Sequence, residues 1–152
     1  MSKERITTVV AESLEAKRRF FTERAADLVA LADAIADRVR AGGKVLVFGN
    51  GGSAADAQHF AGELVGRFTK EGPPIPALAL TTDSSIMTAV GNDYGYEHIS
   101  KRQVEAHARP ADIAVGISTS GNSKNVLEAM KVAKSRGLLT VGMTGEGGGQ
   151  LA

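Results

Sequence analysis

Three ionisable side chains with regular spacing, Asp56, His59 and Glu63, are the groups of this chain best placed to do chemistry. They are three and four residues apart, and a helix turns by ~100° per residue, so all three fall within about 60° on one helix face. A carboxylate on such a face can act as a general base. An imidazole and a carboxylate at i, i+4 are also spaced for two metal ligands; a hydrogen-bonded helix histidine without a metal is the alternative interpretation of His59.

A glycine-rich turn, Asn50-Gly51-Gly52-Ser53, lies directly before these residues. It follows the apolar run of the strand predicted over 44–48 and leads into the helix that carries the ionisable groups. Glycines let the backbone approach a ligand, and the exposed N–H groups at a helix N-terminus favour an anion. The sequence therefore predicts a phosphate-binding turn on the same element as the acid–base or metal-binding groups.

A second turn, Ser118-Thr119-Ser120-Gly121-Asn122-Ser123, also follows an apolar run and opens a helix. Its hydroxyl and backbone N–H groups could donate several hydrogen bonds to one phosphate, whereas an ordinary helix N-cap needs a single hydroxyl. Neither turn has the lysine pattern of a P-loop or the full dinucleotide fingerprint. Phosphate-ester binding is thus expected, without nucleotide hydrolysis and without a nicotinamide cofactor.

The elements that position the two turns alternate between strands and helices. Strands are predicted over 44–48, 76–80, 112–117 and 138–143; helices are predicted over 4–41, 53–68, 84–90, 96–107 and 123–135, with a turn over 91–95. This alternation predicts a three-layer, doubly wound parallel α/β sheet covered by helices on both faces. With flavodoxin-like strand order, the first and third strands are neighbours, and both turns meet at the switch point beyond their carboxyl ends.

Composition limits the classes of protein to consider. The 152 residues predict a single domain over 1–152, with a helical arm over 1–41 and an α/β core over 44–152. The formal net charge of +1, the absence of cysteine and the lack of an apolar stretch of ~20 residues give no indication of nucleic-acid binding, disulfides or a membrane span. A cytoplasmic protein is expected. Apolar residues along the arm, among them Val9, Leu14 and Phe21, predict an oligomer.

These motifs resemble the sugar isomerase (SIS) domain and, within that family, the phosphoheptose isomerases. The similarity rests on Gly49-Asn50-Gly51-Gly52-Ser53, His59-Phe60-Ala61-Gly62-Glu63-Leu64, Val90-Gly91-Asn92-Asp93-Tyr94-Gly95, residues 116–123 and Thr144-Gly145-Glu146-Gly147-Gly148-Gly149. The resemblance implies an aldose–ketose isomerase that converts sedoheptulose 7-phosphate to D-glycero-D-manno-heptose 7-phosphate through an enediol. It further implies a role in heptose biosynthesis for cell-envelope lipopolysaccharide, a homotetramer, and one zinc ion per subunit.

The same resemblance implies roles for individual residues. Glu63 would be catalytic, and His59 with Glu63 would ligate zinc. Substrate contacts would come from both turns and from the segment between them: Asn50, Gly51, Gly52, Asn92, Asp93, Ser118, Thr119, Ser120 and Ser123. We add Ser53 from the first turn, and Asp56, whose alternative is simply to complement the helix dipole.

The sequence departs from the family pattern at its C-terminus. Members of the family continue into a further strand and a long helix, which brings a glutamine and a histidine to the site and completes the zinc shell. This chain stops at Gln150-Leu151-Ala152, so we expect a fragment of a longer product with an incomplete set of zinc ligands. Ser100 is a smaller departure, at a position where an apolar residue or glycine is expected.

Two alternatives to an isomerase stay open at this point. One is a non-catalytic SIS module of the type that associates with the replication initiator, although such relatives generally lack a glutamate at the position of Glu63. The other is a sensor that binds the same phosphosugar without turnover. A different phosphosugar substrate is also compatible with the two turns, because they recognise phosphate and not the carbon chain.

Overall fold

Two helices begin the chain. In the computed structural model, which describes residues 2–152, they are α1 (Lys3–Glu23) and α2 (Ala25–Arg40). The single helix expected over 4–41 is therefore wrong in one detail, since it is interrupted at Arg24. The N–H of Arg24 still donates to the carbonyl oxygen of Phe20, but its dihedral angles (φ −115°, ψ 11°) leave the helical range.

The contacts of the chain divide it into two compact units, the first ending at Ala36 and the second running from Asp37 to Ala152. The first unit holds α1 and most of α2, and no residue of α1 is buried. The second unit holds the sheet and every candidate site residue. None of the helices in residues 2–152 is long and apolar enough to span a membrane.

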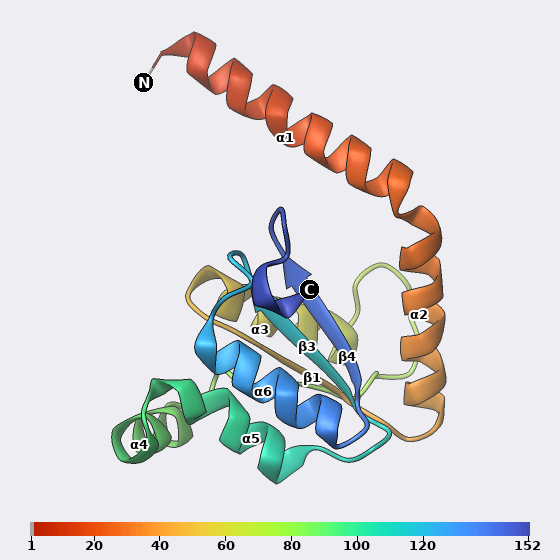
Figure 1. The fold of residues 1–152 in the computed structure, drawn as a ribbon. Helices are drawn as coiled ribbons and strands as arrows, with labels where there is room; N and C mark the ends of the chain where they lie inside the picture. The colour runs from red at the N-terminus through yellow and green to blue at the C-terminus, as the bar shows by residue number, and fades with distance from the viewer. Residues whose placement is uncertain (1) are drawn as a thin grey trace. The chain divides into compact units, whose positions relative to one another are not determined.

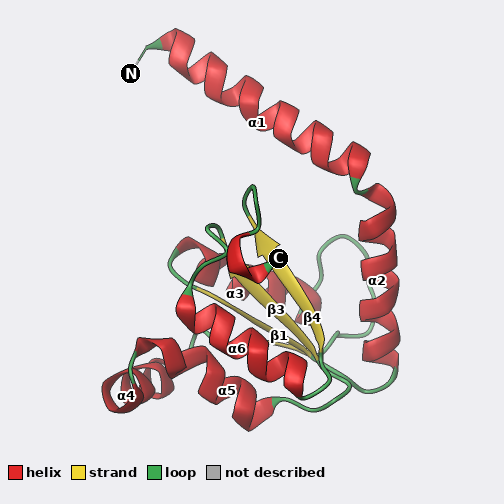
Figure 2. Ribbon diagram, in the orientation of Figure 1, coloured by secondary structure: helices red, strands yellow, loops and turns green. Residues whose placement is uncertain are grey.

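A sheet of four parallel strands forms the centre of the second unit, in the order β2-β1-β3-β4. Figures 1 and 2 show β1, β3 and β4 side by side. The strands are β1 (Val45–Gly49), β2 (Ala77–Ala79), β3 (Ile113–Ser118) and β4 (Leu139–Thr144). This confirms the predicted parallel sheet and its strand order. The register pairs Val45 with Ile113 and Gly49 with Ile117, so β1 and β3 end side by side. Their apolar sequences reflect burial on both faces.

Helices cover both faces of this sheet. They are α3 (Gly52–Val65), α4 (Ser84–Tyr94), η1 (Tyr96–His98), α5 (Ile99–His107), α6 (Lys124–Ser135) and η2 (Gly149–Leu151). Figure 1 shows α6 and α5 in front of the strands and α3 behind them. One core lies between β1, β3 and the front helices, with Phe48, Val104 and Val126 at its centre. The alternation of strands and helices thus produces the expected three layers.

The turn expected over 91–95 is wrong. Residues Asn92 and Asp93 belong to the last turn of α4, which continues to Tyr94 and ends at Gly95 (φ +92°). The N-terminus of α4 is capped by Asp83, whose side chain accepts a hydrogen bond from the N–H of Ile86 at 2.9 Å. Turn-forming residues such as Gly-Asn-Asp bias the chain only weakly, and once a helix has begun each added residue gains a hydrogen bond.

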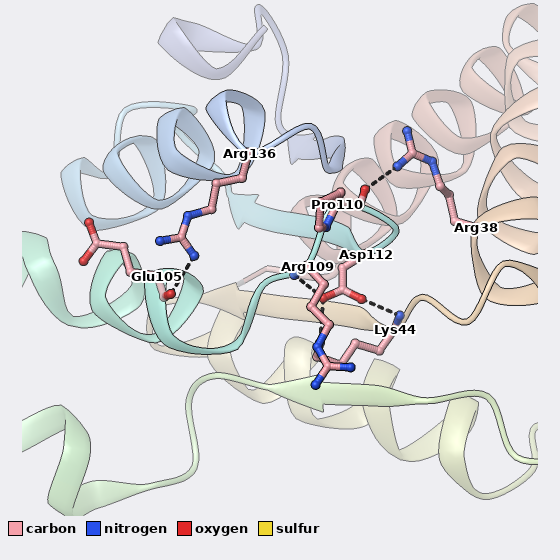
Figure 3. A network of polar contacts seen from close by, with 7 residues as sticks. All are labelled: Arg38, Lys44, Glu105, Arg109, Pro110, Asp112 and Arg136. Carbon is pink, nitrogen blue, oxygen red and sulfur yellow. Dashed lines mark hydrogen bonds and ion pairs between the residues drawn. The ribbon is translucent and has the colours of Figure 1, made fainter.

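A buried ion pair ties the strands together at the end of the sheet remote from the two turns (Figure 3). Asp112 is 1% exposed, and its carboxylate accepts three hydrogen bonds. Lys44 donates two of them, from Nζ at 2.6 Å and from its N–H at 2.9 Å, and the N–H of Arg109 donates the third at 2.8 Å. Lys44 precedes β1 and Asp112 precedes β3, so this carboxylate fixes the starting points of both central strands.

Candidate active site

The first turn presents the N-terminus of α3 beyond the carboxyl end of β1. Gly51 caps this helix with φ +53°, a conformation that favours glycine, and its carbonyl oxygen accepts the N–H groups of Ala54 and Ala55. The N–H groups of Gly52 and Ser53 lie at the start of the helix and have no intrahelical acceptor. This arrangement suits an anion such as a phosphate.

The second turn follows β3 and is organised by its own hydroxyl groups. The Oγ atoms of Ser118 and Ser123 are hydrogen-bonded at 2.9 Å, and the N–H of Asn122 donates to Ser120 Oγ at 3.2 Å. Ser123 occupies the N-cap position of α6 but makes no side-chain capping bond. The helix N-terminus is therefore not occupied by its own serine, which favours an anion site over an ordinary N-cap. Thr119 and Ser120 are exposed and available to a ligand.

The closing glycine-rich loop braces the second turn. The N–H of Gly145 donates to the carbonyl oxygen of Thr119 at 3.0 Å, and the N–H of Gln150 donates to Asn122 Oδ1 at 3.2 Å. Gly121 has φ +64°, and a Cβ atom at this position would collide with the carbonyl oxygen of Gly148. The glycine is thus required both by the turn and by the close approach of the loop.

The ionisable groups of α3 line a cavity of about 410 Å³, as their spacing predicts. His59 Nε2 lies 3.0 Å from Glu63 Oε1, and Asp56 lines the same cavity one turn earlier. Phe60 and Phe68 also line it, so the side chain of Glu63, which is 35% exposed, lies beside apolar surface. A carboxylate in such a setting is partly shielded from water and suited to proton abstraction.

His59 and Glu63 fit part of a zinc site. Two ligands about 2.1 Å from a tetrahedral zinc lie about 3.4 Å apart, close to the 3.0 Å between these two atoms. Across the described residues 2–152, no group of three or more histidine, cysteine, aspartate or glutamate side chains converges on a metal position. Residues 2–152 therefore offer His59 and Glu63 as two neighbouring donors, and the zinc site stays a prediction.

The structure does not gather all the predicted residues into one cavity. Asn92 and Asp93 are exposed at the end of α4, where Asn92 Nδ2 donates to Asp93 Oδ1 at 2.8 Å. A pocket of about 300 Å³ lies instead at the turns, lined by Asn50, Tyr96, Glu97, Ser123, Lys124 and Asn125. Glu63 is separated from the first turn by about three turns of α3. A ligand that used both regions would be extended, with its phosphate at the turns.

Two residues near the turns were missed by the sequence analysis, Tyr96 and Asn125. Tyr96 OH donates to Asn50 Oδ1 at 3.0 Å, and Asn125 exchanges two hydrogen bonds with Asn50. A signal for Asn125 existed: it shares the i, i+4, i+8 stripe with Ala129 and Ala133, which are buried. A polar side chain on the buried stripe of a helix needs a partner. No comparable local signal marks Tyr96.

A parallel α/β sheet with a glycine-rich turn beyond one central strand and a serine-rich turn beyond the other is typical of the sugar isomerase (SIS) class of domains. The sequence profile of the SIS domain matches residues 10–145, and the chain belongs to this family. The phosphoheptose isomerase of Aquifex aeolicus (strain VF5) is 54% identical over 149 residues, which cover 98% of this chain and 78% of that protein. The isomerase of Nitratidesulfovibrio vulgaris is 55% identical over 141 residues, or 93% and 68% of the two chains.

Solved structures give the same result. A phosphoheptose isomerase from Neisseria gonorrhoeae superposes with a TM-score of 0.90 at 45% identity, covering 98% of this chain and 78% of that one. One from Francisella tularensis gives a TM-score of 0.93 at 39% identity, with 99% and 80% covered. Within the SIS family, the chain is therefore a member of the phosphoheptose isomerases, and the expected resemblance is confirmed.

Proposed function

We propose that this chain interconverts sedoheptulose 7-phosphate and D-glycero-D-manno-heptose 7-phosphate in the synthesis of cell-envelope heptose. The observation that carries the proposal is that α3 holds both an anion-binding turn at its N-terminus and the Glu63 carboxylate, with a second anion-binding turn after β3. The chain is also more than half identical to phosphoheptose isomerases. A non-catalytic regulatory module is not favoured, because these relatives are isomerases. A phosphorylated sugar is an intracellular metabolite, so we place the reaction in the cytoplasm.

The reaction moves one proton between two neighbouring carbons. Glu63 Oε accepts a proton from C1 of the ketose while the C2 carbonyl oxygen gains a proton from water, and the C1–C2 enediol forms. The carboxyl group then returns a proton to C2 while the C1 hydroxyl loses its proton to water, which gives the aldose. His59, 3.0 Å from Glu63, orients the carboxylate and can donate a hydrogen bond to a substrate oxygen. The phosphate on C7 is held by the N–H groups of Gly51 to Ser53 and by the hydroxyls of Ser118 to Ser123, which fixes the distant reacting carbons.

Zinc is part of this proposal, with His59 and Glu63 as the two ligands from the described residues. When bound there, the metal would supply Lewis-acid stabilisation of the oxyanion that develops at the substrate carbonyl. Asp56 lines the same cavity and adds negative charge close to the metal position. The further ligands would be water, substrate oxygens or groups that residues 2–152 do not bring to the site.

The proposed function is tested by measuring how fast the protein forms the aldose from sedoheptulose 7-phosphate. The rate is measured twice, with protein purified in the presence of a chelator and with the same protein after zinc is added. We expect turnover that zinc increases by at least about tenfold, as a Lewis acid at the carbonyl stabilises the transition state by several kcal/mol. The epimeric aldose phosphate and a pentulose phosphate serve as substrate controls. Tight binding of the heptulose phosphate without turnover in either state would contradict an isomerase and support the sensor.

A homotetramer is also proposed, and the arm supports it. Apolar side chains of α1 are about half exposed or more in the single chain, among them Val10 (52%), Leu14 (61%) and Phe21 (60%). Apolar surface of this extent is typical of an interface between subunits.

Replacing Leu14 and Phe21 together by glutamate is expected to convert the tetramer into smaller species, because buried carboxylates at an interface are strongly unfavourable. Sedimentation equilibrium measures the change, and Glu12→Lys on the same helix is the charge-changing control. A wild-type monomer, or a tetramer that survives the double substitution, would show that this face is not the interface.

A further inference from the structure

We propose that Asn125 and Tyr96 are positioning residues that hold the first phosphate-binding turn through the side chain of Asn50. Asn50 Nδ2 donates to Asn125 Oδ1, and Asn125 Nδ2 donates to Asn50 Oδ1, each at 2.8 Å. Tyr96 OH donates to the same Asn50 oxygen at 3.0 Å. The inference deepens the proposed function and rests on it, since it assigns how one of the two phosphate-binding turns is kept in place.

Asn125 is buried, so its side-chain amide depends on hydrogen-bond partners within the protein. Asn125 is 3% exposed and lies in the first turn of α6, directly after the serine-rich turn. Its Nδ2 also lies 3.4 Å from the Oγ of Ser100, which is 3% exposed as well. The small polar residue at position 100, unexpected from the sequence, thus makes room for the amide and gives it a second acceptor. Burying these groups is tolerated only because they bond to one another.

The pair of asparagines connects the two turns directly. Asn50 follows β1 and Asn125 follows the turn after β3, and 75 residues separate them in the chain. Two reciprocal bonds allow one relative orientation of the two amides, so the spacing between the turns is fixed before a ligand binds. Tyr96, at the start of η1, adds a third element to this arrangement. Fixing both turns in advance removes part of the entropy that a ligand would otherwise lose on binding.

The bonds of Asn50 also restrict what its side chain can offer a substrate. Oδ1 accepts two hydrogen bonds and Nδ2 donates one, so the amide is largely used within the protein. The first turn then holds the phosphate through the N–H groups of Gly51 to Ser53 and the Ser53 hydroxyl. Asn50 thus supports the turn and keeps one Nδ2–H for the substrate contact that the resemblance implies.

The test compares Asn125→Leu with Tyr96→Phe and with Gln103→Met as a matched control. Gln103 is a second buried amide, 5% exposed, whose Nε2 donates to the carbonyl oxygens of Leu80 and Ile99, neither of which belongs to the two turns. Asn125→Leu and Gln103→Met each remove a buried amide at similar volume, so both are expected to lower thermal stability. Tyr96 is 57% exposed, and Tyr96→Phe removes only one hydroxyl.

Only the two variants of the network should weaken phosphate binding. We expect KM for sedoheptulose 7-phosphate to rise about tenfold in Asn125→Leu and about threefold in Tyr96→Phe, with kcat within about threefold of the wild type, because binding remote from the reacting carbons is lost. The double variant should raise KM by less than the product, since both residues act through Asn50. Gln103→Met should leave KM unchanged.

Two results would overturn the inference. One is a KM within twofold of the wild type in Tyr96→Phe and in any folded Asn125→Leu. The other is a KM that rises in Gln103→Met as much as it does in the two network variants. If Asn125→Leu does not fold, Tyr96→Phe decides alone, because its substitution is at the surface. Titration with inorganic phosphate by calorimetry repeats the comparison without catalysis. An inactive wild type whose phosphate affinity still falls in the network variants would contradict the proposed function and leave the inference standing.

Discussion

Replacing Glu63 by glutamine is expected to lower kcat for heptulose phosphate isomerisation by about 10³-fold, the usual loss when a positioned general base is removed. Glutamine keeps the size of the side chain and its place in the cavity, but its amide cannot accept the C1 proton. KM should change little, since the phosphate is held about three helical turns away. The comparison uses initial rates at saturating substrate.

Exchange of the C1 hydrogen with solvent sharpens this prediction. Formation of an enediol by Glu63 lets the abstracted proton exchange with water, so the wild type in D₂O should label C1 of the recovered ketose. The Glu63→Gln variant should lose this exchange together with turnover, which NMR detects. Glu71→Gln, at the exposed Glu71 that pairs with Arg67, is the control for loss of a glutamate charge and should keep both activities. Turnover of Glu63→Gln within tenfold of the wild type would assign the base elsewhere.

The second large effect is on stability and concerns Asp112. Asp112→Asn is expected to lower the free energy of unfolding by about 3 kcal/mol, because a buried pair that loses one partner leaves polar groups uncompensated. The Asn amide has one oxygen, whereas three donors from Lys44 and Arg109 now surround the carboxylate (Figure 3). Urea unfolding followed by circular dichroism measures the difference, which corresponds to a decrease in Tm of about 6–12 °C.

Asp37→Asn is the matched control for this substitution. Asp37 pairs with Arg40 at 2.6 Å, but both side chains are about three quarters exposed, at 76% and 73%. Exposed pairs of this kind contribute at most about 1 kcal/mol, so the control should be nearly as stable as the wild type. Equal losses in the two variants would show that the burial of Asp112 has no special importance.

The pH dependence of stability gives an independent check on Asp112. Burial of the carboxyl raises its pKa, but the hydrogen bonds from Lys44 and Arg109 and the charge of Lys44 outweigh burial, so the pKa of Asp112 lies below its ordinary value. Because the pKa of Asp112 is lower in the folded than in the unfolded state, its ionised carboxylate stabilises the folded protein at any pH above the unfolded pKa of about 3.9. This contribution is lost as the pH falls from that value through the folded-state pKa. The difference between wild type and Asp112→Asn should therefore be constant near neutral pH and decrease below about pH 4. A difference that stays unchanged at pH 3 would contradict the lowered pKa.

Local patterns in the sequence were sufficient to predict most of the architecture. Apolar runs of strand length alternate with helical periodicity, and this alternation alone requires a parallel sheet with helices on both faces. The positions of the two turns followed as well, because parallel strands bring their carboxyl ends to one edge. The helix face shared by His59 and Glu63 is a matter of spacing within one element, and the structure places both in one cavity.

Contacts between distant segments were decided only by the tertiary structure. Asn50 is hydrogen-bonded to Tyr96, which lies 46 positions further along the chain, and to Asn125, which lies 75 positions further. Nothing in the periodicity around Asn50 indicates that these two residues lie next to it in the fold. The last turn of α4 is helical although its residues favour a turn, because extending an existing helix through Asn92 adds a hydrogen bond for each residue. Sequence by itself therefore determined the elements and the chemistry available to this protein. Packing decided which polar groups support one another, because hydrogen-bond partners are selected by proximity in space and not along the chain.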